Sequence, residues 1–389
     1  MRKRLLLLPF ILFFHSSYTQ YLKLSVYAEV SIITVGAGEN LYEVFGHSTI
    51  RIKDPVLNFD IAYNYGVFDF NAPDFYSNFA KGKLVYFLAR YHFQTFLDGY
   101  KADKRWIKEQ ILDLTQEQKQ AFFEYLEHNA RPENASYLYD PYFNNCATKL
   151  RDITKSILKD NVTFYKAYTS DKTLRQLMND ELYWNTWGSF GIHLALGTKL
   201  DKIATPTEYL YLPDFVFLAF EKGKIKINGE EKPLVKKQND LLIFDEPVQK
   251  FSSTSPLIIF SVFLLVGWYI TFRDKKSGKR SKKFDFILFF TTGVIGIGIV
   301  FLWFFTNHYT TPNNFNMLWA FAPNLLVAFY LLKNEVKGYL KKYVYFISIL
   351  LLILIFFWTT GIQLFSIAAI PLLLLLGVRY FYLLTYKVQ

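Results

Sequence analysis

Two patterns of hydrophobic residues divide the chain. Residues 20–250 alternate apolar and polar positions in short runs between turn signals, which is typical of strands and helices with one buried face. Residues 256–385 instead contain long, nearly uncharged apolar runs of about the length that crosses a bilayer. Five membrane spans are predicted there, over residues 256–272, 284–305, 315–332, 343–358 and 364–384.

The first part opens with strand patterns. Four strands are predicted, over residues 30–35, 47–52, 59–65 and 84–91. In the second of them Ile50 and Ile52 point to one face, whereas His47 and Arg51 point to the other. These strands have short connections, so we expect a small sheet.

Helices are predicted after the strands. Thr115 and Gln118 have the spacing of a capping box, so a helix begins directly after Thr115. A second helix is predicted from Cys146 to about residue 158, with Leu150 and Ile153 on its buried stripe. The segment "KIKINGEEKPLVKK" contains a turn signal and indicates a hairpin.

The loops between the predicted spans differ in charge, and this difference gives their orientation. "RDKKSGKRSKK" (273–283) has seven basic residues and one acidic residue, and "KNEVKGYLKK" (333–342) has four and one. In contrast, "TNHYTTPNN" (306–314) and "TTGIQ" (359–363) have no Lys, Arg, Asp or Glu. Basic loops stay in the cytoplasm, so residues 20–250 are expected outside it.

The amino terminus agrees with this orientation. "MRKRLLLLPFILFFHSS" has basic residues followed by a short apolar run, the form of a secretory signal, so residues 1–19 are predicted to be a signal peptide or an uncleaved signal anchor. Most of the net charge of +11 is then explained by the orientation of the chain in the membrane, because the basic residues cluster beside the predicted spans. No basic and aromatic binding motif occurs in residues 20–250, and we expect no nucleic-acid partner.

Cys146, in "YFNNCATKLRD", is the only cysteine in the chain and has no partner for an internal disulfide. An unpaired thiol in an exported domain has no structural use that serine or alanine could not fill, which favours a reactive role. The predicted position supports that role. The amino terminus of a helix stabilises an anion, and a thiol placed there has a lowered pKa.

A cysteine nucleophile needs a base, and His47 in "FGHSTIR" is the candidate. A third group is expected to orient the imidazole; Asn64 is the first choice and Asp60, on the same strand face, is the reserve. The backbone N–H of Cys146, together with the amide of Asn145, is the candidate oxyanion hole.

Other readings of these residues are kept open. Cys146 also fits a small buried hydrophobic residue, and His47 alone fits a structural role. His308, in an uncharged outer loop, fits a headgroup or interface contact as well as chemistry. With one cysteine and scattered histidines we expect no metal site and no cofactor.

The segments "ITVGAGENLYEVFGHSTIRIKDP", "YNYGVFDF", "FAKGKLVY", "YFNNCATKLRD" and "YLPDF" resemble the exported domain of the Lnb family of bacterial lipoprotein N-acyltransferases. The segment "TPNNFNMLWAFAPNL" resembles the membrane domain of the same family. A strand histidine followed by a cysteine at a helix start is also similar to the permuted papain-like folds of the lecithin:retinol acyltransferase class. The resemblance implies that Cys146 carries an acyl group as a thioester between a phospholipid donor and a lipoprotein acceptor.

The expected protein is therefore α+β, with a permuted papain-like (NlpC/LRAT-like) catalytic domain at residues 20–250, followed by an all-α transmembrane domain of about five helices at 256–385. It is expected in the inner membrane as a multi-pass protein, with the first domain in the periplasm. The resemblance implies an acyltransferase with catalytic Cys146, His47, Asn64 and Asn145. Two alternatives remain: an exported membrane-anchored cysteine peptidase or amidase, and a non-enzymatic membrane-tethered binding module.

Overall fold

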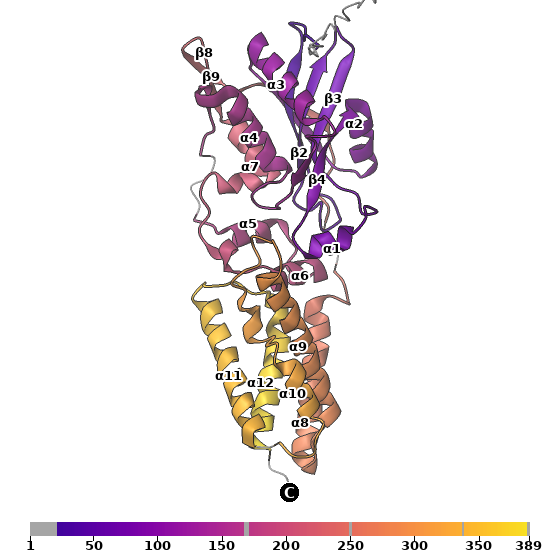
Figure 1. Cartoon of the computed structure of the whole chain (residues 1–389), viewed down its shortest axis with the longest axis vertical. Helices are drawn as coiled ribbons and strands as arrows, with labels where there is room; N and C mark the ends of the chain where they lie inside the picture. Colours follow the sequence, from indigo (N-terminus) through magenta and orange to yellow (C-terminus); the bar gives the residue numbers. More distant parts are fainter. Residues whose placement is uncertain (1–21, 167–170, 249–250, 337, 387–389) are drawn as a thin grey trace, which may run out of the picture.

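The computed structural model describes residues 22–166, 171–248, 251–336 and 338–386. The predicted signal segment, residues 1–19, lies outside them. The described chain forms two parts that stand end to end (Figure 1): a sheet domain, residues 22–248, and a helical domain, residues 251–386.

The sheet domain is built on seven antiparallel strands in the order β10-β5-β1-β2-β3-β4-β6. The strands are β1 (Glu29–Val35), β2 (His47–Asp54), β3 (Phe59–Val67), β4 (Val85–His92), β5 (Ile107–Leu112), β6 (Ser136–Leu138) and β10 (Val235–Leu242). The four predicted strands correspond to β1–β4 and are confirmed. Strand β5 escaped prediction because its polar residues are buried: Glu109 is 5% exposed and accepts a hydrogen bond from Arg51.

Helices cover both faces of this sheet (Figure 1). One face carries α3 (Gln116–Asn129), α4 (Cys146–Leu158) and α7 (Pro213–Glu221), and the other carries α2 (Phe93–Ala102). Ile50 of β2 belongs to the core under α4, whereas the guanidinium carbon of Arg51 lies 3.6 Å from the ring centre of Phe93 in α2. The alternation predicted for β2 is therefore confirmed, and His47 lies on the same face as Arg51.

The remaining elements of the sheet domain are short. They are α1 (Phe75–Ala80), α5 (Leu174–Glu181), α6 (Trp187–Ala195), and a small sheet of β7 (Val162–Thr163), β8 (Lys224–Ile227) and β9 (Glu230–Pro233). Strands β8 and β9 form the predicted hairpin, whose turn residues Asn228 and Gly229 both have positive φ, as a tight two-residue turn requires. The capping box of α3, with Thr115 and Gln118, is also confirmed.

In the helical domain, four helices among the described residues are long and apolar enough to cross a membrane. They are α8 (Pro256–Ser277), α9 (Lys282–Phe304), α11 (Gly338–Thr359) and the segment Ile367–Thr385, which contains α12 (Ile370–Thr385). The predicted span 315–332 is not one continuous helix, and a fifth membrane crossing there stays a prediction. The segment consists of a 3-10 turn (Phe315–Leu318) and a short helix, α10 (Asn324–Tyr330). Helix α10 starts after Pro323, whose nitrogen carries no hydrogen and so cannot donate a helical hydrogen bond.

The broken segment nevertheless joins the two ends of the helical domain. At one end Asn314 donates to the carbonyl of Leu194 in the sheet domain, and at the other the carbonyl of Leu331 accepts from Arg280. Its middle is packed closely on α9, where a Cβ at Gly296 would lie 2.1 Å from the carbonyl oxygen of Ala320. Irregular backbone is tolerated at membrane depth where protein buries it, and Trp319 and Ala320 of this segment are buried.

Four buried charges connect the helices at the end with the basic loops. Arg379 of α12 donates to Asp285 of α9 and, at 2.8 Å, to Asp274 of α8. Arg280 donates to Asp285 at 2.7 Å. Two cations therefore face two anions, which keeps the cluster neutral where unpaired charges would be costly.

Hydrogen bonds hold the sheet domain against the outer loops of the helical domain. The N–H of Gly197 donates to the carbonyl of Thr310 at 2.9 Å, and the side-chain amide of Asn316 donates to the carbonyl of His193 at 2.9 Å. Asp201 accepts from the N–H of Leu364 at 3.1 Å and is paired with the buried Arg175. The contact therefore includes main-chain groups and a buried ion pair.

Gly197 provides a test of this contact. A Cβ at this position would lie 1.9 Å from the carbonyl oxygen of Pro312, so Gly197→Ala is expected to destabilise the protein by about 2 kcal/mol through overpacking. Thermal unfolding of the full chain in detergent measures the effect. Gly191→Ala in helix α6 is the matched control, because a Cβ there meets no atom within 4 Å. Equal unfolding midpoints for the two variants would contradict this packing.

Candidate active site

Cys146 is the first residue of α4, as predicted, and Asn145 is its N-cap. The side-chain oxygen of Asn145 accepts from the N–H of Thr148 at 2.9 Å, and the hydroxyl of Thr148 accepts from the N–H of Asn145 at 2.8 Å. This reciprocal pair fixes the helix start. The thiol is thus held in the first turn of α4, beside backbone N–H groups that have no acceptor within the helix.

The contacts of Asn145 differ from the role expected for it. Its side-chain amide donates to the carbonyls of Pro141 and Tyr211, at 2.8 and 2.7 Å, and its backbone N–H donates to Thr148. Every N–H of Asn145 is therefore engaged, and none is directed at a reacting group. Asn145 instead anchors the loop before Cys146, which leaves the N–H of Cys146 as the candidate oxyanion donor.

His47 is the first residue of β2, and Asn64 lies on the neighbouring strand β3. The Nε2 atom of His47 is 2.5 Å from the side-chain oxygen of Asn64. Asp60, the reserve candidate, is instead bound to Arg51, with two hydrogen bonds of 2.7 and 2.6 Å. Of the two residues considered for orienting the imidazole, the structure brings Asn64 to His47 and directs Asp60 elsewhere.

The imidazole of His47 also meets the thiol of Cys146, through a side-chain hydrogen bond and through charge. Because the oxygen of Asn64 can only accept, Nε2 carries a proton, which leaves Nδ1 as the nitrogen available to Cys146. Cys146 is 8% exposed, whereas His47 keeps more contact with solvent. The two side chains are therefore in contact, as a candidate base and nucleophile must be.

The surroundings lower the pKa of Cys146. Burial alone would raise it, but the positive charge of His47 and the hydrogen bond from its imidazole outweigh burial. The N–H groups of Ser48 and Ala147 donate to the sulfur and lower the pKa further. The thiolate is therefore favoured at a lower pH than for an ordinary thiol.

The pKa of His47 is raised. Burial alone would lower it, but the charge of Cys146 and the hydrogen bonds to Cys146 and Asn64 more than compensate, and the charge of Arg105 opposes them. The directions agree for the two partners. The two shifts have a common cause, because the charged form of each partner stabilises the charged form of the other.

Three further residues border the pair and were not predicted. Arg105 is 5% exposed and donates to the carbonyl of Gly36 at 2.8 Å, and its guanidinium carbon lies 4.9 Å from the ring centre of Tyr100. Tyr100 stacks on His47 with ring centres 6.5 Å apart. Gly66, with φ of 94°, borders the other side, where a Cβ would lie 3.9 Å from that of Cys146. In a polar stretch of sequence, a buried arginine cannot be distinguished from a solvent-exposed one, so the sequence did not identify Arg105.

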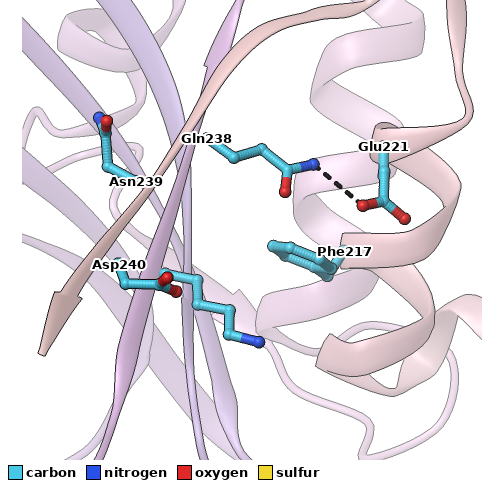
Figure 2. Close-up of a pocket in the computed structure, with 6 residues that line it drawn as sticks. Phe217, Glu221, Gln238, Asn239 and Asp240 are labelled. Atoms are coloured by element: carbon cyan, nitrogen blue, oxygen red, sulfur yellow. Dashed lines mark hydrogen bonds between the residues drawn. The ribbon is translucent and has the colours of Figure 1, made fainter. Parts of the chain in front are cut away.

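A pocket of about 250 Å³ lies elsewhere, between α7 and the edge strand β10 (Figure 2). Its floor includes Phe217, and Gln238 donates to Glu221 across it at 3.2 Å. Neither Cys146 nor His47 lines it. Within the described residues, no group of three or more His, Cys, Asp or Glu side chains comes together as a metal site would require.

His308 contacts the sheet domain. Its Nε2 atom is 2.9 Å from the carbonyl oxygen of Phe79, at the end of α1, and the N–H of Asn307 donates to the carbonyl of Lys81 at 2.8 Å. Of the roles left open for His308, the structure favours a contact at the domain interface.

Comparison with known families gives two matches. The Lnb N-terminal periplasmic domain matches residues 16–179, which include Cys146, His47 and Asn64. The Lnb transmembrane domain matches residues 248–389. No curated protein and no solved structure gave a match. With both of the family's domains present in order, the chain is a membrane protein that belongs to the Lnb family.

Proposed function

We propose that the chain is a lipoprotein N-acyltransferase of the inner membrane, with Cys146 as nucleophile and His47 as base. The observation that carries the proposal is the position of His47, which contacts Asn64 through one nitrogen and Cys146 through the other. Membership of the Lnb family supports the reaction class. The donor in this proposal is a phospholipid, and the acceptor is the α-amine of a lipoprotein's N-terminal cysteine.

The first half of the proposed reaction loads the thiol. The thiolate of Cys146 attacks the ester carbonyl of the phospholipid, and the N–H of Cys146 stabilises the negative charge that develops on the carbonyl oxygen. When the C–O bond breaks, the imidazolium of His47 gives its proton to the departing oxygen. The products are a lysophospholipid and an acyl thioester on Cys146, with His47 neutral.

The second half transfers the acyl group. The acceptor amine attacks the thioester, and neutral His47 takes a proton from the attacking nitrogen. The C–S bond then breaks, which leaves an amide on the lipoprotein and restores the thiolate and imidazolium pair. Asn64 keeps the imidazole in one orientation and one tautomer during both halves.

The position of the site above the helical domain supports membrane-anchored substrates. Phe143, three residues before Cys146, packs edge to face on Tyr309 of the outer loop, with ring centres 5.2 Å apart. The loop directly before Cys146 therefore contacts the loop that follows α9. A hydrolase would use the same pair with water as acceptor, and a binding module would need neither residue.

The ionisation of Cys146 is the first prediction. Because the chain has one cysteine, iodoacetamide labelling reports on Cys146 alone. The labelling rate of the wild-type protein should rise with pH through a midpoint below the ordinary thiol value. In His47→Ala the charge and hydrogen bond that lower the pKa are lost, so the midpoint should move to about 8.5 or higher. His128→Ala, an exposed residue of α3, is the control and should leave the profile unchanged. A profile that His47→Ala does not move would contradict the pairing.

The acyl intermediate is the second prediction. The full chain, in vesicles with phospholipid bearing radiolabelled acyl chains, should acquire label that hydroxylamine releases and that maps to Cys146. Cys146→Ser and His47→Ala should each lower acyl transfer to a lipopeptide amine by about a thousandfold or more, and His128→Ala should not. Absence of the label in wild-type protein would sink the thioester mechanism, and release of free fatty acid without amide formation would identify a hydrolase.

A further inference from the structure

Aromatic rings connect Cys146 with the membrane side of the sheet domain. Tyr139 and Cys146 both border Gly66, where a Cβ would lie 3.7 and 3.9 Å from them. Tyr139 stacks on Tyr86 with ring centres 4.3 Å apart, and Tyr86 stacks on Phe68 at 4.8 Å. The thiol is therefore adjacent to an apolar surface that leads away from it.

This surface continues along α1 to the helical domain. Phe68 stacks on Phe75 at 6.0 Å, and Phe75 stacks on Phe79 one helical turn later at 6.3 Å. Phe79 then packs on His308 of the outer loop, with ring centres 6.4 Å apart. We call the rings of Tyr139, Tyr86, Phe68, Phe75, Phe79 and the adjacent Tyr76 the aromatic path.

Exposure along the aromatic path rises toward the helical domain. Tyr86 is 8% exposed, whereas Phe79 and Tyr76 are 50% and 73% exposed. Helix α1 lies at the end of the sheet domain that faces the helical domain (Figure 1). An exposed cluster of aromatic rings needs a partner, since such a surface in water is unfavourable.

The contacts of α1 identify that partner. The carbonyls of Phe79 and Lys81 bind His308 and Asn307, which follow the membrane helix α9 directly. Exposed Tyr76 and Phe79 therefore lie at the height where α9 leaves the membrane, with exposed Lys81 and Lys83 beside them. Aromatic rings with neighbouring lysines are typical of segments that sit at the boundary between acyl chains and headgroups.

We propose that the aromatic path binds a fatty acyl chain of a lipid from the adjacent leaflet and leads its ester carbonyl to Cys146. The inference rests on the proposed function in taking a lipid ester as the donor. Burial raises the pKa of Tyr86 to about 12 and also raises the pKa of Tyr139, so no charged tyrosine borders the acyl chain along the path. Tyr76 and Phe79 form the entrance, and Tyr139 forms the end next to the thiol.

Photo-crosslinking tests the entrance without requiring turnover. p-Benzoylphenylalanine replaces Tyr76 in one full-length variant and Tyr27 in the control, in vesicles of phosphatidylethanolamine and phosphatidylglycerol with radiolabelled acyl chains. Tyr27 is a matched control because it is 69% exposed and precedes β1 at the end of the strand remote from His47. Crosslinking to lipid should be about tenfold greater at position 76, where the ring reaches the acyl boundary. Equal crosslinking at both positions would overturn the proposal.

Kinetics test the path as part of the reaction. Tyr76→Ser removes an exposed ring that, among the described residues, contacts the ring of Phe75 alone, so the fold is expected to be kept. The phospholipid concentration that half-saturates acylation of Cys146 should rise about tenfold while the maximal rate changes little, as expected for lost ground-state binding. Tyr27→Ser should match wild type. If Tyr76→Ser and Tyr27→Ser are half-saturated at the same phospholipid concentration, the proposed path is wrong and the proposed function stands. If Cys146 is acylated in neither variant, the proposed function is wrong, and the crosslinking result alone tests the path.

Discussion

The hydrogen bonds between the sheet domain and the outer loops of the helical domain are the constraint on which the arrangement depends. They join main-chain groups at Gly197 and Thr310, and at His193 through the side chain of Asn316, so they fix distance and orientation together. The buried pair of Arg175 and Asp201 extends the contact to the N–H of Leu364. The proposed reaction with a bilayer lipid requires Cys146 at a set height above the helical domain, and these bonds fix the sheet domain on that domain.

Within the sheet domain, the site combines two local arrangements of residues. The capping box of α4 fixes Cys146 in the first turn of the helix, and β2 with β3 brings His47 and Asn64 together. Each of these two arrangements alone would lower the pKa of the Cys146 thiol only modestly. Together they give a buried thiol whose charged form is favoured despite burial, because the imidazolium and the N–H groups of Ser48 and Ala147 replace the water that was lost.

The sequence predicted the parts of the molecule whose signals are local. The strands β1–β4, the start of α4 and the candidate pair of Cys146 and His47 follow from periodicity, capping chemistry and the single cysteine. The sequence could not predict contacts between residues that are far apart in the chain and that only the fold brings together. Glu109 and Arg105 look like solvent-facing charges, yet both are buried against partners far along the chain. The span 315–332 has the right hydropathy, but Pro323 and the polar groups around it break the helix, which an average over residues does not detect.

The four buried charges of the helical domain have a consequence for its biogenesis. Of these four charges, the hairpin of α8 and α9 contains Asp274, Asp285 and Arg280, which are two anions and one cation, and the second cation is Arg379 of α12. Until α12 is synthesised, Asp274 has the exposed Arg273 of its own helix at 3.8 Å, and the closer buried contact with Arg379 is missing. The charge cluster is therefore complete only when α12 packs against the hairpin, so the two acids depend on this packing for their full set of cation contacts.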